Sequence, residues 1–371
     1  MKKRNGHEII QLFEQFSPKG YAMEGDKIGL QIGNLNTPVT NVMIALDVLE
    51  EVVDEAIEKN VQLIIAHHPL IYRPLQKIST DTPSGRIIEK LIKHDIAVYA
   101  AHTNLDVAKG GVNDMLADAL QLTNREVLVP TYETILKKLA VFVPEENAES
   151  LKQALGNAGA GSIGNYSHCT FASTGTGQFK PNEEAIPHIG QQGKLESVNE
   201  VRIETIFPEH LEKRVLSAMF KNHPYEEVAY DIYKLDNKGE VLGLGKIGEI
   251  PEMTLEEFAK HVKTTLAVDG VRVVGNLASK VKKVAVLGGD GNKYFMSAKM
   301  KGADVYVTGD MYYHVAQDAM LLGLNIVDPG HNVEKVMKRG VAKKMEMLCA
   351  EKGVDVFVFP SEIHTDPFKF L

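Results

Sequence analysis

The chain has 371 residues, of which 44% are hydrophobic and 24% are charged, and its formal net charge is −8. This composition is ordinary for a globular protein, and the length predicts two or three domains. No apolar run approaches the roughly 18 residues of a membrane-spanning helix, no signal-peptide core is recognisable, and the negative charge argues against a dominant nucleic-acid surface. We therefore expect a cytoplasmic protein, and the two isolated cysteines indicate neither a disulfide framework nor a cysteine metal site.

Strands and helices are predicted to alternate over the first third of the chain. After a short helix at about residues 6–16, the apolar run 39–47 leads into an amphipathic helix at 49–60 and a second run at 61–69. A helix at 84–94 then precedes the run 96–106, and a further helix covers 110–122. Such alternation is typical of parallel or mixed strands joined by helical crossovers.

The middle of the chain has a different rhythm. Apolar runs and amphipathic segments between residues 137 and 235 follow in the order β-α-β-β-α-β, with a Gly-rich connection up to residue 198. That order is the ferredoxin-like arrangement. We place this inserted domain at 132–236, between core segments 1–131 and 237–371.

The last third of the chain repeats the pattern of the first. Strands at 281–290, 303–309 and 324–328 alternate with helices, and a long helix follows. Aligning Asp47 with Asp290 places His67 opposite Asp310, and His102 aligns with His331. We interpret this as an internal duplication that gives two related α/β halves of one core, with a ligand site where the halves meet.

Three clusters of metal-ligand residues follow predicted strands, the position at which open α/β sheets place their chemistry. The clusters are His67-His68-Pro69, His102 with Asp106, and His331 with Glu334. Imidazole and carboxylate ligands without thiolates suit Zn, Fe, Mn or Ni and are typical of open catalytic centres. A lone histidine at a strand end is usually structural, but three matching clusters favour a metal site.

The adjacent histidines favour two ions rather than one. Neighbouring side chains on a strand point to opposite faces, so His67 and His68 are better suited to two metals, with Asp106 or Glu334 as a bridge. His102 is a direct ligand or a residue that orients one. Two divalent ions against two carboxylates leave positive charge, which attracts hydroxide and an anionic substrate, so we infer metal-assisted hydrolysis.

Several other residues have both a functional and a structural interpretation. Asp310 and His314, in TGDMYYH, are candidates for substrate binding or proton transfer, with structural hydrogen bonding as the alternative. GGDGNK (288–293) resembles a phosphate-binding loop weakly and is better read as a tight turn. HPYEE (223–227) is better read as a turn with a solvated acidic face.

Together the motifs resemble the GTP cyclohydrolase I type 2 homologue family, also called NIF-three-like. They are GDKIGLQIG (25–33), IIAHHPLIY (64–72), AAHTNLD (100–106), VTGDMYYH (307–314), DPGHNVEKV (328–336) and TDPF (365–368). The resemblance implies a dinuclear metal site at His67, His68, Asp106, His331 and Glu334, a toroidal homohexamer, and a PII/CutA-like insert that carries HPYEE. The family name implies attack of water on C8 of GTP with release of formate.

Our leading hypothesis is a metal-dependent hydrolase of an anionic small molecule, with a metal-bound hydroxide as nucleophile and GTP as a candidate substrate; zinc is the first choice of metal. The rival is a non-catalytic metal-binding scaffold that recruits partners through its insert. Nucleic-acid binding in the ring cavity is a third hypothesis, which the net charge disfavours.

Overall fold

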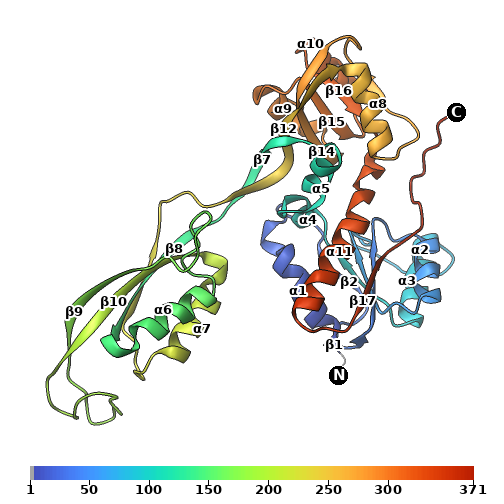
Figure 1. The fold of residues 1–371 in the computed structure, drawn as a ribbon. Coiled ribbons are helices and arrows are strands. Elements are labelled where there is room, and N and C mark those ends of the chain that lie inside the picture. The colour runs from blue at the N-terminus through green and yellow to red at the C-terminus, as the bar shows by residue number, and fades with distance from the viewer. Residues whose placement is uncertain (1–3) are drawn as a thin grey trace. The chain divides into compact units, whose positions relative to one another are not determined.

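The computed structural model describes residues 4–371, and these form two compact units (Figure 1). Unit 1 combines the residues up to Tyr132 with Leu242–Leu371, and unit 2 is Glu133–Val241. Unit 2 extends a few residues past 236, the expected end of the insert, because Thr134 donates a backbone hydrogen bond of 2.9 Å to the carbonyl of Glu240. No helix among the described residues is long and apolar enough to span a bilayer.

The first half of unit 1 is a five-stranded sheet in the order β17-β4-β5-β6-β2, where β2 alone is antiparallel to its neighbour. Its strands are β2 (Gly29–Ile32), β4 (Asn41–Ala45), β5 (Leu63–Ala66), β6 (Ala97–Ala100) and β17 (Phe357–Pro360). Its helices are α1 (Gly6–Phe16), α2 (Glu50–Glu58), α3 (Pro83–Lys93), α4 (Thr103–Val107) and α5 (Val112–Ala119), and the two-residue strands β1 (Arg4–Asn5) and β3 (Pro38–Val39) pair beside it. Every residue of β5 and β6 is buried, as expected of strands that are covered on both faces.

The second half is a six-stranded sheet in the order β13-β16-β15-β14-β12-β7. The halves are therefore not the two core segments expected from the sequence, because each segment contributes one strand, β7 or β17, to the sheet of the other. Its strands are β7 (Thr123–Glu133), β12 (Val241–Thr254), β13 (Arg272–Val274), β14 (Lys280–Asp290), β15 (Val305–Gly309) and β16 (Asn325–Asp328). Its helices are α8 (Leu255–Thr265), α9 (Phe295–Met300), α10 (Tyr313–Leu321) and α11 (Val336–Glu351). Strands β14, β15 and β16 are parallel and β13 is antiparallel to β16, which repeats the arrangement of β4, β5, β6 and β2.

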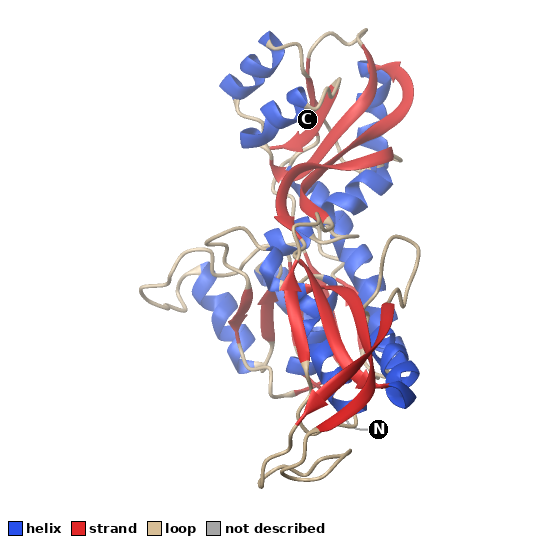
Figure 2. Cartoon of the chain, turned by 90° about the vertical axis from the view of Figure 1, so that its left-hand side faces the viewer, coloured by secondary structure: helices blue, strands red, loops and turns tan. Residues whose placement is uncertain are grey.

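Alternation along the strands distributes the apolar side chains of unit 1 among three buried clusters. Val42, Ile44 and Ile65 of the first sheet share one cluster with Val286 and Val307 of the second, together with residues of α1, α5, α8 and α11. The opposite face of the first sheet packs on α2 and α3, and that of the second sheet packs on α9 and α10. Figure 2 shows helices beside the strands of both sheets. The shared cluster joins the two halves and brings their loops together.

Local sequence explains where several helices begin. The Asn5 side chain accepts a hydrogen bond from the backbone of Glu8 at the start of α1, and Thr82 caps α3, whose first residue is Pro83. Thr254 and Glu257 form a reciprocal capping box at the start of α8. These residues satisfy backbone N–H groups that have no partner within the helix.

Unit 2 contains a four-stranded antiparallel sheet in the order β11-β8-β10-β9. Its elements are β8 (Leu136–Pro144), α6 (Ala148–Asn157), β9 (Phe171–Phe179), β10 (Glu196–Pro208), α7 (Glu212–Asn222) and β11 (Tyr230–Lys234). One face of the sheet packs on α6 and α7 in a cluster that includes Leu139, Val141, Leu151, Ile203 and Val215. Unit 2 therefore has a hydrophobic core of its own.

Candidate metal centre

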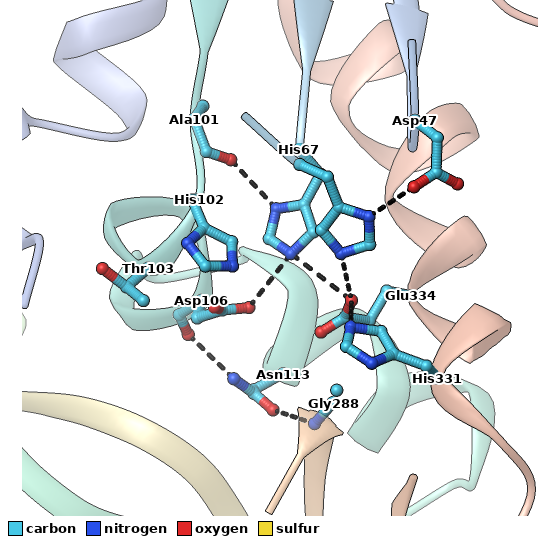
Figure 3. A network of polar contacts seen from close by, with 12 residues as sticks. Asp47, His67, Ala101, His102, Thr103, Asp106, Asn113, Gly288, His331 and Glu334 are labelled. Atoms are coloured by element: carbon cyan, nitrogen blue, oxygen red, sulfur yellow. Dashed lines mark hydrogen bonds and ion pairs between the residues drawn. The ribbon is translucent and has the colours of Figure 1, made fainter. Parts of the chain in front are cut away.

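The ends of β5, β6 and β16 bring the three predicted clusters into one group of side chains in unit 1 (Figure 3). Three sets of side chains have ligand atoms within 4.8 Å of one another and could hold a metal ion. The sets are His67, His68 and His102; His68, His331 and Glu334; and His67, Asp106 and Glu334. The residues predicted from the sequence thus meet at the boundary between the two halves.

Glu334 is the centre of this group. Its Oε2 atom lies 3.0 Å from Nε2 of His68, 3.2 Å from Nε2 of His331 and 3.6 Å from Nε2 of His67. The side chain is 3% exposed, so its negative charge has little contact with water. Three ring nitrogens therefore face one buried carboxylate oxygen. A positive charge between these atoms would balance the charge of the carboxylate.

His67 and His68 do not diverge as expected for neighbours on a strand. Strand β5 ends at Ala66, and the rings that follow lie 5.1 Å apart, with the Nε2 atom of each close to Oε2 of Glu334. Their Nδ1 atoms have separate partners, because His67 donates to the carbonyl of Ala101 at 2.9 Å and His68 to Asp47 at 2.6 Å. These partners fix both rings and direct both Nε2 atoms towards Glu334, where a metal ion could bind them.

The residues present fit a metal ion, because two buried polar atoms of the group lack a hydrogen-bond partner. These atoms are Nε2 of the fully buried His67 and Oδ1 of Asp106, which lie 3.7 Å apart. Since Nδ1 of His67 donates to a carbonyl, Nε2 carries the lone pair whenever the ring is neutral, and this nitrogen faces two carboxylates. Buried polar atoms are seldom left without a partner, and a bound cation would satisfy both.

The pKa values of the group follow from burial and from the charges inside it. Burial raises the pKa of the Asp106 carboxyl to about 6, against the opposing charge of His67. Burial alone would lower the pKa of His68, but its hydrogen bonds with Asp47 and Glu334 raise it to about 10. The hydrogen bond with Glu334 is the main cause of the raised pKa, about 9, of His331. Without metal, protons on these rings supply the positive charge that the carboxylates require.

His331 and Glu334 lie in the 3₁₀ helix η5 (His331–Lys335) and not in the long helix that follows it. In a 3₁₀ helix, residues three apart lie directly above one another, so the three-residue step places both side chains on one face. Asp310 holds the other end of the His331 ring by a hydrogen bond of 2.7 Å to Nδ1. Asp310 therefore orients His331.

His102 precedes α4 and lies beside His67, with ring centroids 5.3 Å apart. Its Nδ1 atom is 2.9 Å from Asp26, which also accepts hydrogen bonds from the backbone and hydroxyl of Thr103. The hydrogen bonds of Asp26 outweigh its burial and hold its pKa well below the usual range. His314 lies apart from the cluster, exposed on α10, with its ring 3.2 Å from Gln317.

The residues GGDGNK make room for Glu334. A Cβ atom on Gly288 would lie 2.9 Å from Oε1 of Glu334, and one on Gly289 would lie 2.8 Å from the same atom. Asn113 of α5 accepts a hydrogen bond from the Gly288 backbone at 3.0 Å and donates to the carbonyl of Asp106 at 3.1 Å. The glycines of this motif therefore allow Glu334 to approach the backbone closely. Asn113 links the two halves through its hydrogen bonds with Gly288 and Asp106 (Figure 3).

Two cavities open onto the cluster. The larger, about 680 Å³, borders His68, Asp106, His331 and Glu334 and is also lined by Tyr72, Lys293 and Tyr294. The smaller, about 340 Å³, is lined by His68, His331, Asp310 and the chain end from Thr365 to Phe368. Sequence reasoning did not select Asp26, Asp47, Asn113, Lys293 or Thr365. Asp26, Lys293 and Thr365 do lie in the motifs GDKIG, GGDGNK and TDPF.

The whole chain resembles proteins of known sequence and structure. The family model described as Duf34/NIF3 (NGG1p interacting factor 3) matches residues 4–367. The chain is 65% identical over 371 residues to a Bacillus subtilis protein named GTP cyclohydrolase 1 type 2 homolog, and 60% identical to one of that name from Halalkalibacterium halodurans, with full coverage of both chains in each case. A crystal structure of a Bacillus cereus protein related to NIF3 is 65% identical and matches with a TM-score of 0.96 over all of both chains. The chain therefore belongs to the Duf34/NIF3 family.

Proposed function

We propose that this protein is a metal-dependent hydrolase whose cluster holds two divalent ions, zinc being the first choice. The observation that carries the proposal is the approach of three histidine Nε2 atoms to Oε2 of Glu334, beside the unpartnered atoms of His67 and Asp106. In this proposal His67 and Asp106 would hold one ion, His68 and His331 would hold the other, and Glu334, which faces all three rings, would be a ligand of both. Divalent ions in such a site lower the pKa of water and stabilise negative charge that develops on a substrate.

The protein's own residues would orient the ligands and the substrate. Asp47 and Asp310 fix the rings of His68 and His331, and the carbonyl of Ala101 fixes His67. Lys293 lines the larger cavity, so a cationic group is available to an anionic molecule, and Tyr72 and Tyr294 can pack against an apolar part of that molecule. We therefore propose an anionic small-molecule substrate, and the name shared by the relatives makes GTP the first nucleotide to test.

Metal analysis tests the ligand assignment. Protein purified without chelators and then loaded should contain about two divalent ions per chain. Replacing His68 or Glu334 by glutamine should lower that content while the circular dichroism spectrum stays unchanged, because open catalytic sites lie on a preformed scaffold. His94→Gln, at an exposed histidine after α3, is the matched control and should retain full content. Full loading of Glu334→Gln would refute the bridging role.

Turnover is measured on the same loaded samples with GTP, other nucleotides and phosphoesters. Release of formate from GTP that is lost in Asp106→Ala would support a cyclohydrolase. Retained metal without turnover of any compound would favour the second candidate, a metal-binding scaffold that recruits partners through unit 2. That candidate is favoured by the separate hydrophobic core of unit 2.

We also propose that unit 2 is a ferredoxin-like insert of the PII/CutA type and that the two halves of unit 1 arose by duplication. The strand order β11-β8-β10-β9 supports the first, and the matching order of β4-β5-β6-β2 and β14-β15-β16-β13 supports the second. The family resemblance further suggests a homohexamer. Light scattering coupled to size-exclusion chromatography should then give about six times the 40.9 kDa mass of the chain.

A further inference from the structure

Unit 2 contains a cleft of about 420 Å³ whose lining residues all belong to that unit. It lies between the end of β9, the loop over residues 180–195 and the HPYEE segment at 223–227. Its size is in the range of small-molecule sites, which are about 300–1,000 Å³. The proposed hydrolase site makes no use of this cleft, so it needs a separate explanation.

Aromatic rings gather around Tyr225 in the cleft. Its ring centroid lies 5.9 Å from that of Phe179 and 6.3 Å from that of His188, both of which line the cleft. The buried His223 helps to fix the HPYEE segment, because its Nδ1 accepts a hydrogen bond of 3.1 Å from the backbone N–H of Tyr225. The faces of such rings carry partial negative charge and attract cations.

Carboxylates occupy the same cleft. Glu200, Glu226 and Glu227 line it, and Lys180 is the only ammonium group among its lining residues. The hydroxyl of Tyr225 donates to Glu200 at 3.1 Å and so holds that carboxylate beside the ring. Gly177 leaves the space for it, since a Cβ atom there would lie 2.1 Å from Oε2 of Glu200.

The guanidinium of Arg202 lies 5.8 Å from the centroid of the Phe142 ring, which lines the cleft, but it pairs with a carboxylate that is not among the lining residues. Arg202 follows Glu200 by two positions on β10, and it forms an ion pair of 2.8 Å with Glu204. Excess negative charge therefore remains beside the aromatic rings.

The cleft is already shaped without a ligand. The Glu226 carboxylate accepts a hydrogen bond of 2.7 Å from the backbone of Ile186 and so ties the 180–195 loop to the HPYEE segment. Pro181 and Pro187 restrict the loop further and line the cleft themselves. A preformed site of this kind binds with a smaller loss of conformational entropy.

We propose that this cleft binds a small organic cation with an apolar body, of the arylalkylammonium class. The rings receive the apolar body and one face of the cation, and Glu200 with Glu227 supplies the opposite charge. An anion would face three carboxylates. A metal ion is disfavoured because none of the side-chain groups in residues 4–371 that could hold one includes a residue of this cleft.

Isothermal titration calorimetry on the full-length, metal-loaded chain tests the proposal with three probes of similar shape. The probes are 2-phenylethylammonium, the neutral 2-phenylethanol and the anionic phenylacetate. The cation should bind at least about tenfold more tightly than either of the others. Equal or tighter binding of the alcohol or the carboxylate would overturn the proposal, and so would failure of the cation to bind at millimolar concentration.

Variants of unit 2 test whether the cation binds in the cleft, and they leave the residues of the metal centre unchanged. Glu200→Gln should weaken binding of the cation about tenfold. Glu227→Gln should weaken it several-fold, and because Glu227 is exposed, this change should not disturb the fold. Tyr225→Leu removes a ring face and the hydroxyl that holds Glu200, so it should reduce the cation's advantage over the alcohol. Glu149→Gln, which removes an exposed carboxylate of α6 outside the cleft, is the matched control and should bind as the parent does. If Glu200→Gln and Glu227→Gln both bind as the parent does, the site is elsewhere and the proposal fails.

Discussion

Asp47 accepts a hydrogen bond of 2.6 Å from Nδ1 of His68, and this contact directs the other ring nitrogen of His68 towards Glu334. The same relationship recurs in the second half, where Asp310 accepts from His331 at 2.7 Å. Each aspartate follows a strand that neighbours its histidine's strand in the sheet. Carboxylates in this position fix the ring orientation and raise the basicity of the ligating nitrogen.

Thr365 should strengthen metal binding through Asp47. Its hydroxyl donates to Oδ2 of Asp47, while Oδ1 of the same carboxylate accepts from His68. Thr365→Val should therefore weaken metal binding about tenfold, a typical effect of losing a residue that orients a ligand. Thr365→Ser keeps the hydroxyl and should bind metal as the parent does. Competition with a chromophoric chelator measures both, and equal affinities of the valine and serine variants would contradict the role.

Gly289 should be required for the position of Glu334. An added Cβ atom would lie 2.8 Å from Oε1 of Glu334, and the backbone φ of 66° already disfavours a side chain. Gly289→Ala should thus lower metal affinity as well as stability. Gly353→Ala is the matched control, because its φ is 62° and nothing lies within 4 Å of the added atom. Both variants should lose roughly 1 kcal/mol of unfolding free energy from backbone strain, but only Gly289→Ala should lose metal affinity. Equal metal affinity in the two would show that Glu334 adjusts freely.

Unit 1 should fold and bind metal without unit 2. Strands β7 and β12, which enter and leave unit 2, are hydrogen-bonded neighbours in the six-stranded sheet, so a short flexible linker can replace Glu133–Val241. All five proposed metal ligands lie in unit 1. The shortened protein should remain folded by circular dichroism and retain the metal content of the parent. An insoluble product, or a folded product that stays metal-free under the same loading conditions, would show that unit 2 completes the core or the site.

His223 should make the stability of unit 2 depend on pH. Burial lowers the pKa of this histidine, whose Nε2 donates to the carbonyl of Phe142 at 2.8 Å while Nδ1 accepts from Tyr225. Because its pKa is lower in the folded state, the unfolded chain is protonated first as the pH falls below about 6.5. Stability should therefore be full above that pH and decrease below it, with a slope of at most about 1.4 kcal/mol per pH unit.

Chemical denaturation at pH 7.5 and 5.5 checks this dependence. His223→Gln has no titrating ring, so the difference in unfolding free energy between the two pH values should be smaller in the variant than in the parent. The comparison removes the contribution of the other histidines, which both proteins share. An unchanged difference would mean that His223 is protonated equally in the folded and unfolded states.

Local patterns in the sequence were sufficient to locate the ligand-bearing loops. Short apolar runs such as LIIA and AVYA are buried strands, and His67, His68 and His102 follow them as predicted. The helix predicted at residues 6–16 is α1, and the parallel strands of both halves occur where the alternation placed them. These features are readable because strand and helix periods are encoded by residues close together in the chain.

The same patterns could not distinguish Asp310 from His314, which lie four residues apart in one motif. Asp310 follows β15 and orients His331, whereas α10 begins at Tyr313 and leaves His314 exposed. The sequence also suggested that His67 and His68 point apart, but the strand ends before them and both rings face Glu334. Where a strand ends is set by its neighbours in the sheet, and a single segment does not reveal it.

The sequence by itself determined which residue types stand at the strand ends and that the two halves share one order of elements. The tertiary structure decided that a single oxygen of Glu334 faces three histidines and that Asp26, Asp47, Asn113 and Thr365 support the group. Glu334 is 266 positions from His68, and Thr365 is 318 positions from Asp47. No local period relates such pairs, because their contact depends on how the two sheets pack around one shared hydrophobic cluster.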